Sequence, residues 1–336
     1  MDYFLECTSM AAVIPMLWIS YFFLTAKTEN IRQIFIHIYE DYETLQVDAK
    51  ELEILLKYSK MTKIVIISYI VYTTSTMFAY VIIGQIPYYM DLINPLNETR
   101  PRYYPAEVNY VLFEEDNYYL AVTTHELFGV VYGVNLIVLS DLILFLCSRH
   151  TCALFGVLKY KILSINKNKD GEFLDVDDPV MYENACACAK LHIRILAFIE
   201  LTNSCFAMAL LLLFSTTVMI MSFHLSMIIL KQQDFNYFVK GVSIAIGQAI
   251  HIFFNCFTGQ MVQSQSSNLT SHLYDFHWYD TKKKIAMVIY YMTSRSLIEC
   301  NLNVGKTLVL GLDLYTTIMK TIFSYLNVLN SRHNAN

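Results

Sequence analysis

The chain has 336 residues, of which 55% are hydrophobic and only 16% are charged, and its formal net charge is −5. Soluble globular domains usually carry about 25% charged residues. This composition excludes an ordinary soluble domain and predicts an all-α polytopic membrane protein. Because the net charge is small and charged residues of both signs are spread along the chain, no nucleic-acid-binding surface is expected.

Six stretches have the length and apolar character of spanning helices, which need about 20 mainly apolar residues. The first follows an acidic start rather than the basic region of a signal peptide, so we interpret it as a span. Several stretches exceed the thickness of the hydrocarbon layer, which predicts helices that project into the cytoplasm. In chain order the predicted spans are residues 4–24, 63–84, 119–147, 193–223, 239–260 and 307–329.

The loops between these spans are alternately rich and poor in Lys and Arg. The first, third and fifth loops are basic, whereas the second, residues 85–118, holds only Arg100 and Arg102 and the fourth holds a single lysine. Basic loops stay in the cytoplasm, so the C-terminus is predicted to be extracellular. Asn97 begins a glycosylation sequon in the outer second loop, where it can be modified. The sequon at Asn268 is expected to be silent, because its loop is cytoplasmic.

Two cytoplasmic loops have patterns of their own. Residues 31–60 repeat apolar side chains at helical spacing among charged ones, which predicts amphipathic helices below the membrane. Residues 166–180 read as a solvated loop with a turn at Gly171. The apolar segment 282–293 is too short to span and is expected to be a cytoplasmic helix.

No sequence motif indicates catalysis. There is no nucleophile elbow, P-loop, metalloprotease motif or dinucleotide-binding loop. The eight cysteines are scattered through mainly apolar segments without the spacing of a zinc site. We therefore predict no catalytic residue, no metal site and no cofactor.

The outer halves of several spans combine aromatic rings with small hydroxyl and amide groups. An apolar wall with a few hydrogen-bonding groups is what a pocket for a small apolar molecule needs. Such residues also pack spanning helices against each other, so helix packing stays an alternative. The candidate ligand-binding residues are Tyr72, Thr73, Thr76, Tyr80, Phe128, Tyr132, Gln248 and His251.

The last span carries polar residues at intervals that keep them on one helix face. A buried ionisable residue in a span usually faces protein or water. The stripe therefore predicts either the wall of a water-filled pathway or a polar lock between helices. Lys320 could face a partner acid such as Asp141. The polar face holds Asp313, Thr317, Lys320, Ser324, Asn327 and Ser331, and the opposite face holds Leu312, Tyr315, Met319, Ile322 and Leu326.

The C-terminal third resembles the insect odorant receptor family. The resemblance begins at LYDFHWYD, continues through KKKIAMVIYYMTSRS and ends in LVLGLDLYTTIMKTIFSYLNVL. Upstream, FEEDNYYLAVTTHELF is similar to the segment that enters the family's fourth span. The matching residues are Tyr274, Trp278, Tyr279, Leu314, Ile318, Lys320, Ser324 and Tyr325, with Asp141 and Cys152 upstream.

The resemblance implies seven spans with an inside N-terminus, so the span missing here is expected to be the first. It implies a ligand-gated cation channel, a heterotetramer with a shared odorant co-receptor, in the plasma membrane of sensory neurons. The ligand would be a small volatile odorant. The loop at 148–192 lacks the co-receptor's long insertion, which implies a ligand-tuning subunit. The last helix would line the pore, with Val328 at the hydrophobic gate and Ser324 and Ser331 beside it.

Residues 1–260 are accordingly expected to form a transmembrane ligand-binding bundle with cytoplasmic extensions. Residues 261–336 are expected to form a cytoplasmic anchor helix and the pore-lining span. A gustatory-type receptor channel would share this architecture. A G-protein-coupled receptor would need the opposite orientation, and a polytopic lipid-modifying enzyme would need a His/Asp constellation that is not evident.

Overall fold

A computed structural model describes residues 13–45, 48–95, 100, 104, 118–168, 171–175, 178–230, 235–276 and 278–335. These residues are largely helical and include one two-stranded hairpin. The helices in chain order are α2 (Val13–Ala26), α3 (Thr28–Leu45), α4 (Ala49–Ile93), α5 (Tyr119–Leu163), α6 (Pro179–Leu230), α7 (Phe235–Asp275), the short 3-10 helix η2 (Trp278–Asp280), α8 (Lys283–Ser296) and α9 (Leu312–Ala335). The strands are β1 (Asn303–Val304) and β2 (Leu308–Val309).

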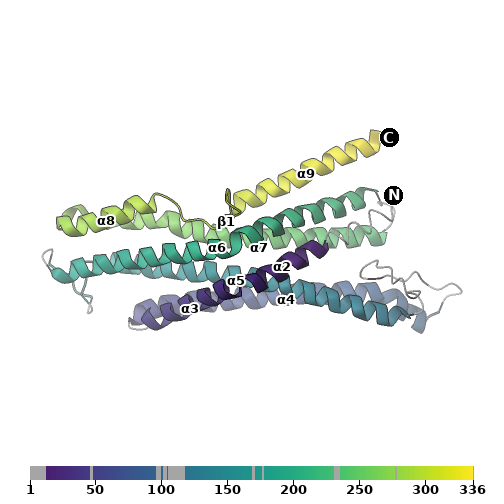
Figure 1. Ribbon diagram of the computed structural model, residues 1–336, viewed down its shortest axis with the longest axis horizontal. Helices are drawn as coiled ribbons and strands as arrows, with labels where there is room; N and C mark the ends of the chain where they lie inside the picture. The colour runs from purple at the N-terminus through teal and green to yellow at the C-terminus, as the bar shows by residue number, and fades with distance from the viewer. Residues whose placement is uncertain are drawn as a thin grey trace.

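Four long helices build the body of the molecule. Helices α4, α5, α6 and α7 have 45, 45, 52 and 41 residues. At 1.5 Å per residue each is about 60–80 Å long, roughly twice the thickness of the hydrocarbon layer. Figure 1 shows them in an elongated bundle, with α5 in contact with α4, α6 and α7. The expected helical projections beyond the spans are therefore present.

The two ends of the bundle hold different connections. Those assigned to the cytoplasm, between α3 and α4, α5 and α6, and α7 and α8, lie at one end in Figure 1. The last turn of α4, the first turn of α5 and the end of α9 lie at the other end. The loops rich in Lys and Arg thus lie at one end of the bundle, and the loops poor in these residues belong to the other end. Asn97 lies outside the described residues.

The predicted spans coincide with helices, and their boundaries differ. Among the described residues, three segments are long and apolar enough to cross a membrane: Tyr119–Leu163, Pro179–Ser226 and Gly241–Asp280. Helix α2 covers the described part of the predicted first span, since residues 1–12 lie outside the description. Hydropathy identifies the apolar stretch of each helix but not its charged extension into the cytoplasm, so the long helices run beyond the predicted limits.

The start of the last span was predicted wrongly. Residues 307–311 are not helical, because the chain turns there in the hairpin β1–β2 and α9 begins only at Leu312. Val304 pairs with Leu308 across the turn, and Gly305 has a φ of +66°. That conformation is readily accessible to glycine, which has no Cβ to clash. The short apolar run around the turn resembles the start of a helix but forms strand and turn instead.

The main hydrophobic core lies in the cytoplasmic half of the bundle. Cys147, Leu154 and Leu158 on α5 are fully buried and belong to a cluster that extends over α6, α7, α8 and α9. Ile34 of α3 and Leu55 of α4 join the same cluster, which confirms the amphipathic helices predicted for residues 31–60. This packed half holds the helices in register, while the outer half is more open.

Candidate functional site

Helices α4, α5 and α7 meet at a buried polar cluster. The carboxylate of Asp141 on α5 accepts a hydrogen bond from the Tyr69 hydroxyl at 2.8 Å. It also accepts one from Asn255 Nδ2 at 2.9 Å and faces His251 Nε2 at 3.2 Å. All four residues are buried, and Asp141 is 3% exposed. We call Tyr69, Asp141, His251 and Asn255 the Asp141 cluster.

The Asp141 cluster satisfies a carboxylate in a helical segment of spanning character. An ionised carboxylate only accepts hydrogen bonds, so three converging donors replace its lost hydration. Because His251 Nε2 faces a carboxylate oxygen, that nitrogen carries the hydrogen and donates. The Tyr69 ring stacks on Phe254 with centroids 4.2 Å apart, and Phe145 lies 5.2 Å from Phe254. These aromatic rings seal the cytoplasmic side of the cluster.

The candidate residues of α4 continue outward from Tyr69. Thr73, Thr76 and Tyr80 follow it by four, seven and eleven residues, which keeps them on one helix face. Tyr69 is 9% exposed, whereas Tyr72 and Thr73 are half-buried and Thr76 is exposed. The exposure of this face of α4 therefore increases outward from the Asp141 cluster. The side chain of Tyr80 lies outside the described residues.

On α7, Gln248 lies one turn outward from His251. The spacing of three residues puts both side chains on neighbouring positions of one face. His251 is tied to Asp141, and Gln248 is half-buried with its Oε1 atom fully buried. Thr73 and Thr76 of α4, and Gln248 of α7, therefore lie one to two turns outward from the Asp141 cluster on their own helices.

Two other candidate residues lie apart from this group. Phe128 and Tyr132 on α5 are 71% and 61% exposed. Tyr132 precedes Asp141 by nine residues, which turns it to the opposite face of α5. The structure does not bring these two side chains together with the others, and their ligand contact stays a prediction.

Helix α9 has the two faces that its sequence predicts. Each residue of the polar stripe is exposed, and Ile322 on the opposite face is buried. Leu312, Tyr315, Met319 and Leu326 on that face are half-buried. The apolar residue Val328 is 52% exposed and lies between Ser324 and Ser331, which are both exposed. Figure 1 shows α9 leaving the bundle obliquely.

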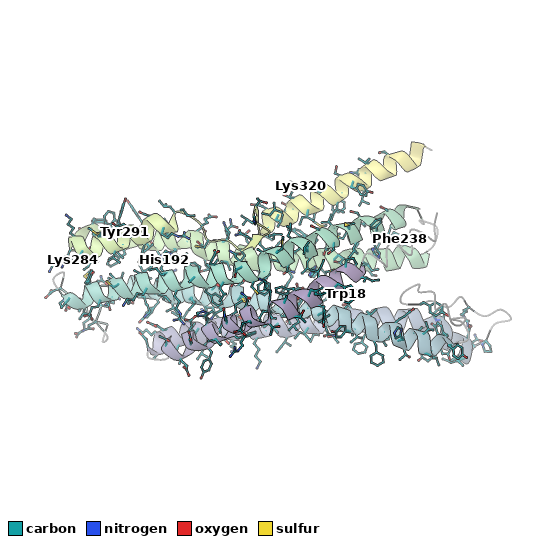
Figure 2. The ribbon with its side chains drawn as sticks, viewed as in Figure 1. Trp18, His192, Phe238, Lys284, Tyr291 and Lys320 are labelled. Carbon is teal, nitrogen blue, oxygen red and sulfur yellow. The ribbon has the colours of Figure 1, made fainter. Side chains whose placement is uncertain are left out.

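Lys320 does not pair with Asp141. Asp141 is buried between α4, α5 and α7 and accepts from three other side chains. Lys320, labelled in Figure 2, is exposed on α9. This rules out Asp141 as the partner acid within the chain and leaves Lys320 on the polar face.

Helix α7 also holds the beginning of α9. The Leu312 backbone N–H donates to Gln260 Oε1 at 3.2 Å. Phe253 and Tyr315 make an edge-to-face contact with centroids 5.5 Å apart. Gly259 packs directly on the backbone of Leu310, with no room for a side chain between them. Helix α7 therefore carries His251 of the Asp141 cluster and also the residues that contact the beginning of α9.

A cavity of about 420 Å³ lies far from the Asp141 cluster, at the cytoplasmic end between α3, α5 and α6. Lys161 and Arg194 at its wall are ion-paired with Glu51 and Asp41 respectively. His150 Nε2 also lies 2.8 Å from the Asp41 carboxylate. These ion pairs join the cytoplasmic helices around the cavity. The residues predicted to bind ligand do not line it.

Sequence reasoning missed the Asp141 cluster as a unit. Tyr69 lies three residues before the candidate Tyr72, Asp141 is a lone acid in a span, and Asn255 lies four residues after His251. A lone acid in a spanning helix signals a functional site by itself. Its donors could have been sought among the polar residues that recur at helical spacing in the other spans.

Replacing Asp141 with leucine is expected to destabilise the bundle, because Tyr69, His251 and Asn255 lose their common acceptor. A buried unpaired donor costs about 1–3 kcal/mol, and values within membranes fall toward the low end. We expect a loss of about 3 kcal/mol in total. The apparent melting temperature of the detergent-solubilised protein should fall by about 5 °C or more.

Asp141→Asn should fall between the wild type and the leucine variant, because it keeps the shape and one carbonyl acceptor. The matched control is Asp175→Leu, since Asp175 is exposed in the connection between α5 and α6. A surface change of this kind should alter the free energy of unfolding by no more than about 0.5 kcal/mol. Equal melting temperatures for both leucine variants would contradict the stabilising role of the Asp141 cluster.

These features define a multi-pass helical membrane protein, with a partly polar site among its helices and a separate amphipathic helix at its C-terminal end. The family described as "7tm Odorant receptor" matches residues 4–323, nearly the whole chain. The chain belongs to this family and is an odorant receptor, which places it among receptors rather than enzymes.

Solved structures with the same fold come from an insect. The olfactory receptor OR5 of Machilis hrabei in complex with eugenol has a TM-score of 0.75 and 13% sequence identity, over 97% of this chain and 80% of that one. The OR5 structure described without eugenol has a TM-score of 0.66 and 13% identity, over 96% and 79%. At this identity the likeness establishes the fold. No curated protein sequence is significantly similar to the chain.

Proposed function

We propose that this receptor is the ligand-tuning subunit of an odorant-gated, non-selective cation channel. It assembles as a heterotetramer with an odorant co-receptor subunit in the plasma membrane of sensory neurons. The observation that carries this proposal is the division of α9 into an apolar face packed on the chain and an exposed polar face. In a spanning helix, an exposed polar face needs water or other subunits as its neighbours.

The polar face of α9 supports a channel wall formed between subunits. Ser324 and Ser331 offer hydroxyls on either side of Val328, and all three side chains are exposed. A hydrophobic constriction between polar segments gates by dewetting. Val328 is the proposed gate. Lys320 lies two turns inward on the same face, so a co-receptor that contributes other side chains at this level would reduce repulsion of cations.

The ligand binds in the outer half of the bundle, on the outer side of the Asp141 cluster. Tyr72, Thr73 and Thr76 of α4 and Gln248 and His251 of α7 form its walls, and the Asp141 cluster forms its floor. The OR5 receptor, which shares the fold, is described in complex with eugenol. The ligand of this chain is a small volatile odorant of largely apolar character.

The test is co-expression of the chain with an odorant co-receptor in cells that have neither. An odorant panel should evoke inward cation currents in cells with both subunits. Cells with only the co-receptor should not respond to the same odorants. Failure of every odorant, with both subunits at the cell surface, would count against the channel proposal.

A further inference from the structure

Two buried polar atoms in the proposed ligand site have no hydrogen-bond partner among the residues that the structure describes. They are Oε1 of Gln248 and Nδ1 of His251. His251 is 8% exposed, so solvent does not satisfy its ring nitrogen. Buried polar groups in native proteins nearly always have a partner. Two such atoms, one turn apart on the same face of α7, indicate a ligand group that completes them.

The Asp141 cluster determines what His251 can offer. Its Nε2 donates to the Asp141 carboxylate, so Nδ1 accepts in the neutral ring and donates in the protonated ring. Gln248 Oε1 is a carbonyl-type acceptor in the same region. Gln248 Oε1 therefore needs a donor, and His251 Nδ1 needs a donor or an acceptor according to the protonation of its ring.

The threonines of α4 add acceptors and no free donors. The Thr73 hydroxyl donates to the backbone oxygens of Tyr69 and Ile70, at 3.0 and 3.1 Å. The Thr76 hydroxyl donates to those of Tyr72 and Thr73, at 3.0 and 2.9 Å. Both threonine hydroxyl hydrogens are already donated to backbone oxygens, while the hydroxyl oxygens can still accept hydrogen bonds.

We propose that this site selects odorants that carry a hydroxyl group, an alcohol or a phenol, with the hydroxyl held by Gln248 and His251. The proposal rests on the proposed function and specifies its ligand class. A hydroxyl donates its single hydrogen to Gln248 Oε1, and its oxygen accepts from His251 Nδ1 in the protonated ring. An ether of the same skeleton has no hydrogen to donate and leaves Gln248 Oε1 unpaired.

The experiment compares each alcohol with its methyl ether. The pairs are thymol with thymol methyl ether, and octanol with methyl octyl ether, applied to the receptor co-expressed with the co-receptor. The ether of each pair should need about tenfold more ligand for a half-maximal current, because an unpaired buried acceptor is penalised. Gln248→Met removes the acceptor at similar length, and should bring the ratio of the two concentrations close to one.

Asn135→Leu is the matched control, because it also removes an amide from a helix of spanning character. Asn135 is exposed on α5 and its amide donates to its own backbone at Val131, so the preference for the alcohol should persist. Ethers as potent as alcohols in the wild type, or an unchanged ratio in Gln248→Met, would overturn the proposal.

A second measurement separates this inference from the channel proposal. The rise in melting temperature of the purified receptor with thymol, against thymol methyl ether, reports binding without current. A larger rise with thymol supports the hydroxyl site even where no current is found, in which case the channel proposal alone fails. An equal rise with both ligands overturns the hydroxyl site whether or not currents are evoked.

Discussion

Gly259→Ala is expected to lower the stability of the receptor by about 3 kcal/mol and to abolish its response to odorants. A Cβ on Gly259 would lie 2.7 Å from the carbonyl carbon of Leu310 and closer still to its oxygen. The obstructing atoms belong to the backbone, so no side chain can rotate away. Helix α7 would have to separate from the segment that leads into α9.

The functional consequence follows from the two roles of α7. His251 and Asn255 hold the Asp141 cluster, and Gly259 and Gln260 lie one to two turns further along, against Leu310 and Leu312. A shift of this contact would misplace the beginning of α9 relative to the proposed ligand site. The measurement is the melting temperature of the purified variant, together with odorant-evoked current at matched surface expression.

Gly247→Ala is the control on the same helix. Nothing lies within 4 Å of a Cβ at Gly247. Alanine is the better helix former by about 1 kcal/mol, so this variant should be as stable as the wild type or more so. If Gly259→Ala melted together with Gly247→Ala and responded normally, the close contact between α7 and Leu310 would have no role in the fold.

The sequence was sufficient for features that depend on local periodicity. Long apolar runs identify the cores of α5, α6 and α7, because hydropathy is summed over neighbours in the chain. The two faces of α9 follow from the spacing of its polar residues alone. The start of α9 was misplaced, because the short apolar run around Gly305 and Gly311 is compatible with helix or strand.

The Asp141 cluster could not be read in the same way. Asp141 is separated from Tyr69, His251 and Asn255 by 72, 110 and 114 positions in the chain. Which polar residues meet depends on how three helices are rotated and aligned, and periodicity does not specify either. For the same reason the sequence grouped Phe128 with Tyr72, although α5 directs Phe128 away from the Asp141 cluster.

Val328→Ser is expected to raise the current that flows without odorant several-fold. Val328 is an exposed apolar side chain between Ser324 and Ser331 on α9, and serine is smaller and carries a polar hydroxyl. A hydrophobic constriction blocks ions because water leaves it, and a hydroxyl retains water there. The measurement is the fraction of the maximal odorant-evoked current that is present before odorant is added.

Val71→Ser is the matched control, because Val71 is 57% exposed on α4, comparable to the 52% of Val328. It follows Tyr69 by two residues and so lies on the opposite face from the ligand site. A serine there changes the outer surface of the helix and should leave the basal current unchanged. Equal basal currents in both variants, with both at the cell surface, would remove Val328 from the gate. A basal current that rises in Val328→Ser alone would place the exposed face of α9 on the ion pathway. The same substitution at a comparably exposed position on α4 would then have no effect, because that position does not line a channel.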